Sequence, residues 1–176
     1  MYIVHTKRGP YFFADTTANI QPDARTLADT ALLAAEQVEH FNIKPVIAVV
    51  SYSNFGAIKG ASSNRAREAV EILHREHPKL LVDGEMQMNY ALNSELRAKK
   101  FPFSKLGKKR VNTIIFPNLS SGNIAYKMMQ EIGGCQVTGP ILLGIGKPIH
   151  ILQMESDVRE IVDMAAFAVV DAQFRG

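Results

Sequence analysis

The chain has 176 residues, 47% hydrophobic and 21% charged, values typical of one globular domain or one lobe of a larger one, which excludes wholesale disorder and a coiled coil. Its net charge of +3 is too small to indicate nucleic-acid binding, and no apolar run approaches the roughly 20 residues of a membrane-spanning helix. A single cysteine, Cys135, and an N-terminus without the apolar core of a signal peptide favour a reducing compartment, so we expect a cytoplasmic protein without nucleic-acid or membrane partners.

The chain begins with an alternation of strands and helices. Residues 11–13 predict a strand, and Pro22 is suited to the first turn of the following helix, where its missing N–H costs nothing. Residues 46–50 are continuously apolar, which is typical of a strand covered by helices on both faces. The apolar face expected on the intervening helix consists of Leu27, Ala31, Ala34, Val38 and Phe41.

The next strand–helix units follow the same pattern. Residues 80–82 predict a short strand that ends at residues 83–84, and a helix over 93–100 precedes a buried strand at 111–116. The residues placed to cap the two helices of this stretch are Ser62 or Ser63, and Asn93 or Ser94. The inner face expected on the first of these helices consists of Ala66, Ala69, Val70 and Leu73.

The C-terminal third predicts two further helices and one more strand. Gly133-Gly134 is expected to end the first of these helices, residues 141–143 predict a late strand, and a last helix begins near Asp157. At least four strand–helix units predict an α/β fold with a mostly parallel sheet. The apolar residues expected on the two helices are Ile124, Met128 and Ile132, and, facing inward on the last helix, Val158, Ile161, Val162, Ala165 and Val169.

Small, polar or acidic residues follow the predicted strands, and in an open α/β sheet these carboxyl ends line the ligand pocket. Residues 51–63 are the most suggestive stretch, because four serines, an asparagine and two glycines precede a helix start. Backbone N–H groups in such a setting bind phosphate. An ordinary Ser/Gly connector has the same composition, so both interpretations stay open. The other ends are residues 15–17, 83–85 and 117–123.

Three other features carry weaker functional interpretations. Residues 97–110 hold seven basic residues and no acid, which indicates a solvated loop or, alternatively, a contact for a phosphorylated ligand. His74 and His77 lie near a helix end, where favourable charge explains them better than metal ligation, so no metal site is expected. Asp83 and Glu85 form a possible acid–base pair, although acids beyond a strand often cap the next turn.

Ordered motifs along nearly the whole chain resemble one known family. They are TKRGPYFFADTTANIQPDA, VVSYSNFGAIKGASS, LLVDGEMQMNYALNSELR, FPFSKL, IIFPNLSSGNIAYKMMQEIGG, GPILLGIGKPIHILQ and VREIVDMAAFAVVDAQ. Together they resemble the C-terminal phosphotransacetylase-like domain of bacterial NADP-dependent malic enzymes. Phosphotransacetylases proper share FP-L--GN--YK and GPIL-G-KP, whereas the SYSNFG loop and the ending IVDMAAFAVVDAQ are more similar to the malic-enzyme branch.

The resemblance implies a three-layer α/β/α fold of the isocitrate-dehydrogenase and phosphotransacetylase type, with acyl-CoA and phosphate bound between two lobes. Residues 1–148 would form the second lobe, and residues 149–176 a return segment and helix that pack on a first lobe missing from this chain. The malic-enzyme catalytic domains would be missing as well. The pocket residues that the resemblance implies are Ser51, Ser53, Asn54, Gly56, Asp83, Glu85, Asn123, Tyr126 and Lys127.

The resemblance also implies that the catalytic positions of the family are altered here. Active phosphotransacetylases carry a Ser-Arg pair and a later Asp, and these positions align with Gln153, Met154 and Glu160. Met154 has neither charge nor donor, so bidentate phosphate recognition is lost there. Thr16 stands where some members have a reactive cysteine. We therefore expect no catalytic residues in this chain.

Three functional hypotheses follow from these observations. The leading one is an acetyl-CoA-sensing regulatory and oligomerisation domain of an NADP-dependent malic enzyme, which converts malate to pyruvate with NADP and Mg²⁺ or Mn²⁺ in domains absent here. The alternative is an active phosphate acetyltransferase or butyryltransferase, and a third possibility is a purely structural dimerisation module. We expect a homodimer or higher oligomer in each case. The sequence leaves open which acyl-CoA binds and whether it inhibits or activates.

Overall fold

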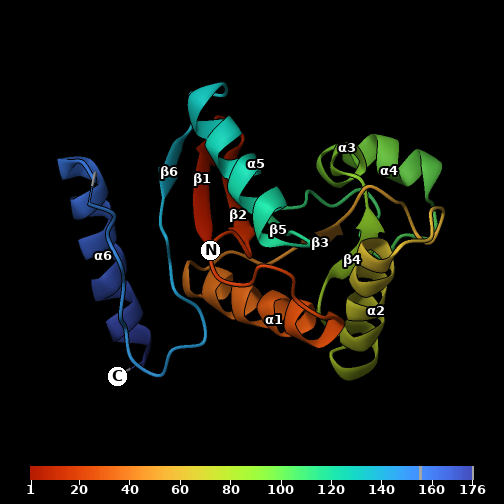
Figure 1. The fold of residues 1–176 in the computed structure, drawn as a ribbon, viewed down its shortest axis with the longest axis horizontal. Coiled ribbons are helices and arrows are strands. Elements are labelled where there is room, and N and C mark those ends of the chain that lie inside the picture. Colours follow the sequence, from red (N-terminus) through yellow and green to blue (C-terminus); the bar gives the residue numbers. More distant parts are fainter. Residues whose placement is uncertain (155, 176) are drawn as a thin grey trace.

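The computed structural model describes residues 1–154 and 156–175, and they form a six-stranded sheet with helices on both faces (Figure 1). This arrangement confirms the predicted α/β fold. The strands are β1 (Tyr2–Thr6), β2 (Gly9–Ala14), β3 (Ile47–Val50), β4 (Val82–Met86), β5 (Thr113–Ile115) and β6 (Gln136–Thr138). The helices are α1 (Ala24–His40), α2 (Ala61–Glu76), α3 (Met88–Leu92), α4 (Ser94–Lys100), α5 (Leu119–Glu131) and α6 (Val158–Arg175).

The sheet is mixed but mostly parallel, with the strand order β4-β3-β5-β2-β1-β6. The four strands from β4 to β2 run parallel, and Ile47 of β3 pairs with both Val82 of β4 and Thr113 of β5. β1 pairs antiparallel with β2 on one side and with β6 on the other. The carboxyl ends of β2, β3, β4 and β5 therefore meet at one edge, where ligands bind in open α/β sheets.

Alternating side chains divide the apolar core into two clusters, one on each face of the sheet. Phe12 of β2 belongs to the cluster under α1 and α2, whereas its neighbour Phe13 belongs to the cluster under α5 and the α3–α4 pair. Figure 1 shows α1 and α2 on one side of the sheet and α5 on the other. Because successive strand residues point to opposite faces, the continuous apolar run at 46–50 fills both clusters.

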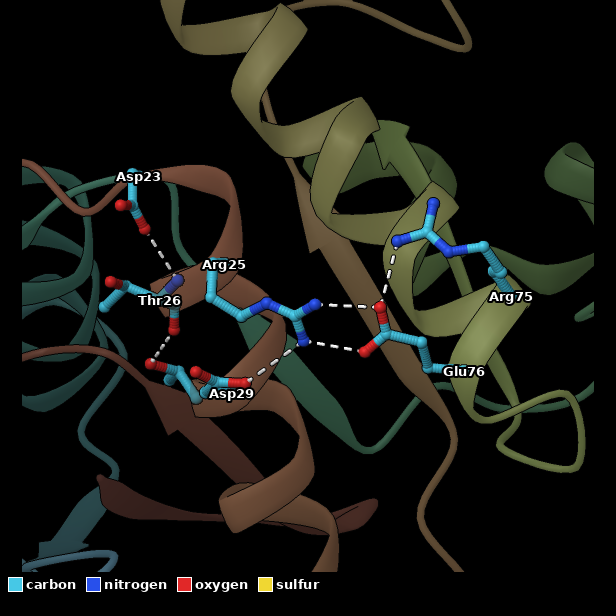
Figure 2. Close-up of polar contacts among 7 residues, drawn as sticks. Asp23, Arg25, Thr26, Asp29, Arg75 and Glu76 are labelled. Carbon is cyan, nitrogen blue, oxygen red and sulfur yellow. Dashed lines mark hydrogen bonds and ion pairs between the residues drawn. The ribbon is translucent and has the colours of Figure 1, made fainter.

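Polar contacts fix the start of α1 and join it to the end of α2 (Figure 2). The Asp23 carboxylate accepts a hydrogen bond of 2.8 Å from Thr26 N and caps α1, so Pro22 lies outside the helix rather than in its first turn as predicted. Arg25 donates to both oxygens of Glu76, at 2.7 and 2.8 Å. These bonds, together with one from Arg75, lower the pKa of Glu76 to about 2.

Two other helix starts were predicted, one wrongly and one correctly. α2 begins after Gly60, so neither Ser62 nor Ser63 caps it. The buried Ser63 hydroxyl instead donates back to the Ile58 carbonyl at 2.8 Å. The cap of α4 is Asn93 as predicted, because its side chain accepts a hydrogen bond of 2.9 Å from Leu96 N.

Two strand predictions need correction, and β1 was missed. The strand expected at 80–82 begins at Val82 and runs on to Met86, so Asp83 and Glu85 lie within β4 and not beyond it. Residues 141–143 form no strand. Ile141 is buried in the core, and this burial accounts for the apolar residue that suggested a strand. The late strand is β6, which ends before Gly139-Pro140. β1 was not predicted at all, although it forms a hairpin with β2.

The inward face predicted for α6 is wrong, and the apolar residues that marked α5 in the sequence are exposed. On α6, the residues in the core are Met164 and Phe167, and their exposed fractions are 4% and 5%. The residues predicted to face inward are largely exposed, including Val158 at 78% and Val162 at 60%. On α5, the exposed residues include Ile124, Met128 and Ile132. Figure 1 shows α6 at the edge of the molecule, beyond β6. None of the helices in the described part of the chain is long and apolar enough to cross a membrane.

Candidate functional site

The loop that follows β3 folds back on itself and onto β4. Phe55 N donates to the Glu85 carbonyl at 2.7 Å, and Gly56 N donates to the Glu85 side chain at 2.8 Å. Ile58 N donates to the hydroxyl of the fully buried Ser53 at 3.0 Å. These three N–H groups are therefore committed to internal acceptors and do not point toward a bound anion.

Asn54 and Gly56 hold this loop in a conformation that few other residues allow. The Asn54 side chain accepts a hydrogen bond of 2.8 Å from Gln87 N, which joins the loop to the residue after β4. Gly56 has φ +84°, and a Cβ there would lie 2.7 Å from Nη1 of Arg67. Four of the predicted pocket residues, Ser53, Asn54, Gly56 and Glu85, are thus brought together by the loop's own hydrogen bonds, and Ser51 is adjacent.

The predicted acid–base pair has two different structural roles. Asp83 Oδ2 accepts hydrogen bonds from the Ser104 hydroxyl at 2.7 Å and from Lys105 N at 2.8 Å, so this carboxylate orients the 104–105 loop. Glu85 is fully buried, and its Oε1 holds Gly56 N. Its second oxygen, Oε2, is buried without a hydrogen-bond partner among the described residues. Glu85 is therefore the member of the pair with spare acceptor capacity.

A second group of predicted residues lies in a recess formed by β1, α5 and the return segment. Tyr126 of α5 is buried and stacks on Tyr2, with ring centroids 4.0 Å apart. Lys127 is exposed, and its ammonium lies 5.4 Å from the Tyr126 ring centroid. The recess has a volume of about 50 Å³. Its lining residues are Tyr2, Tyr126, Lys127, Gln130, Val137, Gly139, Gln153, Ser156 and Glu160.

The recess brings together Tyr126 and Lys127 with Gln153 and Glu160, two of the three positions that the resemblance implies are altered. Gln153 Nε2 donates a hydrogen bond of 3.0 Å to the Tyr2 hydroxyl. Glu160 is the third residue of α6, and its Oε2 accepts a hydrogen bond from Asp157 N while its own N donates to Asp157, as in a capping box. Met154 does not line the recess, and its side chain is fully exposed.

Tyr2 is the site residue that the sequence did not reveal. Burial raises its pKa, and the hydroxyl of Tyr126 and the carboxylate of Glu160 raise it further, so Tyr2 stays protonated over the ordinary pH range. A neutral phenol beside Gln153 can accept one hydrogen bond and donate another. The signal for a strand was available in the apolar run Tyr2-Ile3-Val4, but nothing there indicated a contact with residue 153.

A separate hollow of about 150 Å³ lies beside the end of β2. Asp15 contributes to its wall and is held by a ring of donors: Thr17 N, Ala18 N and both nitrogens of Asn19. Burial alone would raise the pKa of Asp15, but these hydrogen bonds outweigh it and lower the pKa below its usual range. Thr16, at the position of the family's reactive cysteine, is fully buried. The other lining residues are mostly apolar.

The remaining candidates have structural explanations. Arg97 does not belong to the solvated basic run, because it is fully buried and its guanidinium donates to four backbone carbonyls. The other six basic residues of the run are exposed. His74 contacts the Val82 carbonyl at 2.9 Å and so packs on β4. No cluster of His, Cys, Asp and Glu suited to a metal ion occurs among the described residues.

The fold and the placement of these residues define a phosphotransacetylase-like lobe. Residues 1–169 match the family model described as Phosphate acetyl/butaryl transferase, and the chain belongs to this family. It also superposes on a solved phosphotransacetylase from Streptococcus pyogenes with a TM-score of 0.91 and 36% identity. That match covers 98% of this chain and 53% of the other.

Relatives of two kinds are similarly close in sequence. The NADP-dependent malic enzyme of Escherichia coli (strain K12) is 42% identical over 166 residues, which cover 94% of this chain and 22% of that protein. The phosphate acetyltransferase of Clostridium acetobutylicum is 37% identical over 168 residues, which cover 95% of this chain and 50% of that protein. The chain thus spans about a fifth of one kind of relative and about half of the other.

Proposed function

We propose that this chain is an acetyl-CoA-sensing regulatory and oligomerisation domain of an NADP-dependent malic enzyme, and that it has lost transacetylase activity. The parent reaction would be the oxidative decarboxylation of malate to pyruvate. Catalytic domains outside this chain would perform it and would supply the sites for NADP and a divalent metal. The observation that carries the proposal is that Gln153 and Glu160 are engaged in structural hydrogen bonds, while Met154 is exposed and has no donor.

Acyl transfer to phosphate needs a base for the thiol and preorganised donors for the phosphate oxygens. Gln153 already donates its amide to Tyr2, and the Met154 side chain is fully exposed and has no donor. Glu160 is the acid that lines the recess, but its carboxylate caps the start of α6. Because the loss of one preorganised donor costs about 10²–10³ in rate, these altered positions favour binding without turnover.

Groups that can bind an acyl-CoA are nevertheless present. Lys127 places an exposed ammonium at the recess, and such a charge attracts phosphate oxygens. Asn123 lies half-buried on the same helix, four residues before Lys127. A ligand held here would regulate a distant active site by linkage, because it would favour one arrangement of the oligomer over another.

The exposed face of α5 supports self-association. Ile124, Met128 and Ile132 are 58%, 54% and 82% exposed and recur every four residues, so they form one apolar stripe on the helix. We propose that this stripe lies at the interface of a homodimer. Met128→Glu should shift the protein toward monomer in sedimentation velocity, and an unchanged sedimentation coefficient would show that the interface lies elsewhere.

The test of the main proposal is NADPH formation from malate by the natural protein that carries this chain, measured while acetyl-CoA is titrated. A saturable change in rate, of either sign, is the expected result. Lys127→Ala should shift the titration to higher acetyl-CoA concentration without changing the rate in its absence. Malate turnover that is indifferent to acetyl-CoA would leave the chain as an assembly element, and no malate turnover would refute the malic-enzyme assignment.

The second candidate function is an active phosphate acetyltransferase or butyryltransferase. It is favoured by the similar identity to proteins named phosphate acetyltransferase, such as the one from Paracoccus denitrificans, which is 40% identical over 167 residues. Acetyl phosphate formation from acetyl-CoA and phosphate at millimolar concentrations would support this candidate. A Gln153→Ser, Met154→Arg double variant should raise any residual activity, whereas no gain would indicate that further parts of the site are missing.

A further inference from the structure

We propose that the hydrogen bond between Gln153 and Tyr2 is an inhibitory contact, which closes the recess until an acyl-CoA displaces it. This inference rests on the proposed function, because it names how that binding site is regulated. Three observations support it. The recess is small, one wall is buried while the Gln153 wall is exposed, and hydrogen bonds connect Gln153 to the start of α6.

The recess is too small for the ligand while Gln153 is in place. Its volume of about 50 Å³ holds a few water molecules, whereas pockets for small ligands measure about 300–1,000 Å³. Most of its lining is polar, so it is a place for hydrogen-bonding groups and not a gap in the core. A bound thioester or phosphate therefore requires one wall to move.

Gln153 is the wall that can move at least cost. Tyr2 and Tyr126 are both buried, and their rings stack with an angle of 18° between their planes, which fixes the opposite wall. Gln153 is exposed and belongs to a segment without helix or strand. One neutral hydrogen bond of 3.0 Å joins this side chain to the hydroxyl of Tyr2. Its release leaves both partners free to bind water or ligand.

The backbone around Gln153 connects the recess to α6. Gln153 N donates to the Ser156 hydroxyl at 3.2 Å, and Ser156 N donates to the Gln153 carbonyl at 3.1 Å. The next residue, Asp157, shares the reciprocal cap with Glu160 at the start of α6. Displacement of Gln153 would therefore disturb the first turn of α6. Because that helix exposes an apolar face, the disturbance would reach whatever packs on it.

The test measures the affinity for acetyl-CoA of the natural protein that carries this chain, by isothermal titration calorimetry. Gln153→Ala and Tyr2→Phe each remove one partner of the contact, and Phe retains the stack on Tyr126. Each variant should bind acetyl-CoA about two- to tenfold more tightly than the unsubstituted chain, the range expected for one neutral hydrogen bond. The double variant should bind no more tightly than either single one, because both substitutions remove the same bond.

Gln136→Ala is the matched control. Gln136 also ties α6 to the body of the molecule, through a hydrogen bond of 2.6 Å to Asp163, but it does not line the recess. Its substitution should leave the affinity unchanged. Equal tightening by Gln136→Ala would overturn the inference, because general loosening of α6 would then explain the effect. Hydrogen exchange at residues 149–157 should become faster when acetyl-CoA is added, and unchanged exchange would also count against release.

The two proposals fail in different ways. If the unsubstituted chain binds acetyl-CoA but Gln153→Ala and Tyr2→Phe bind it equally or more weakly, the inhibitory contact is refuted and the sensing function stands. If neither the unsubstituted natural protein nor any variant of it binds acetyl-CoA, the sensing function is refuted and the inhibitory contact with it. Circular dichroism and urea unfolding of each variant establish that the affinities compare folded proteins.

Discussion

Replacement of Arg97 should be among the most destabilising single changes in this chain. Its side chain is fully buried, and its guanidinium donates to the carbonyls of Tyr90, Ala91, Gly107 and Lys109. Two of these bonds measure 2.9 Å and one 3.2 Å. They connect α3 and α4 to the 101–109 loop. Burial lowers the pKa of Arg97, while the carboxylate of Asp83 opposes that effect.

The expected loss follows from the four acceptors. A hydrogen bond to a charged group contributes about 1.5–3 kcal/mol, and a buried acceptor left without a partner costs about 1–3 kcal/mol. The losses are not additive, because the 101–109 loop can relax and admit water. For Arg97→Met, which keeps a similar apolar stem, we expect the free energy of unfolding to fall by about 3–5 kcal/mol, close to the effect of breaking a buried ion pair.

Urea unfolding followed by circular dichroism measures this loss. With a slope of about 2 kcal/mol per molar urea, the midpoint should fall by roughly 1.5–2.5 M. Arg97→Lys is the control, since it keeps the charge but cannot reach four separate carbonyls, and it should lose about half as much. A loss below about 1 kcal/mol for Arg97→Met, or an Arg97→Lys variant as stable as the parent, would refute the assignment of a structural clamp.

Three further predictions concern stability. The pKa of Asp15 is lower in the folded protein than in the unfolded chain, so this carboxylate stabilises the fold above its unfolded pKa of about 3.9. That stabilisation is lost as the pH falls through the folded pKa, and Asp15→Asn should therefore reduce the acid dependence of thermal unfolding. Gly56→Ala should cost about 1–2 kcal/mol in urea unfolding, because φ is +84° and Arg67 occupies the Cβ position. Met164→Ala should cost about 2–4 kcal/mol, whereas Val162→Ala should be nearly neutral; the reverse order would restore the predicted inward face of α6.

Sequence patterns predicted the structure correctly where the interactions that form an element lie within that element. The continuous apolar run at 46–50 could only belong to a strand covered on both faces, and Asn93 could cap a helix within its own turn. The end of β4 was predicted too early because Asp83 is polar, and the burial of this carboxylate in a strand depends on Ser104, which lies 21 residues away. A local sequence pattern cannot predict a hydrogen-bond partner so far away in the chain.

The helix faces show a different limit. Val158, Ile161 and Val162 have the spacing of a buried face, yet Met164 and Phe167 are the residues that reach the core. α6 carries apolar residues on more than one side, so periodicity alone cannot say which side meets the sheet. The same holds for α5, whose apolar stripe is exposed. Apolar residues on both sides are typical of a helix that packs between two bodies.

The candidate site was predicted as a list of residues but not as an arrangement. The acceptors of the 51–60 loop are Ser53 and Glu85, and they turn its N–H groups inward. The contact between Gln153 and Tyr2 joins residues 151 positions apart, so no local pattern in the sequence predicts it.

Under the proposed function, the contact between Gln153 and Tyr2 would account for a recess that keeps its binding residues while position 153 lacks the serine of active relatives. A serine at position 153 is too short to span the distance that the Gln153 amide covers, so the family's catalytic residue and the tie to Tyr2 are alternatives at one position. Under the proposed function, a chain that no longer needs turnover would use the position to hold the return segment against β1. The recess would keep Lys127 and Tyr126 as binding groups, and its occupancy would be coupled to the segment that leads into α6. Loss of chemistry and gain of regulation would thus follow from the same substitution.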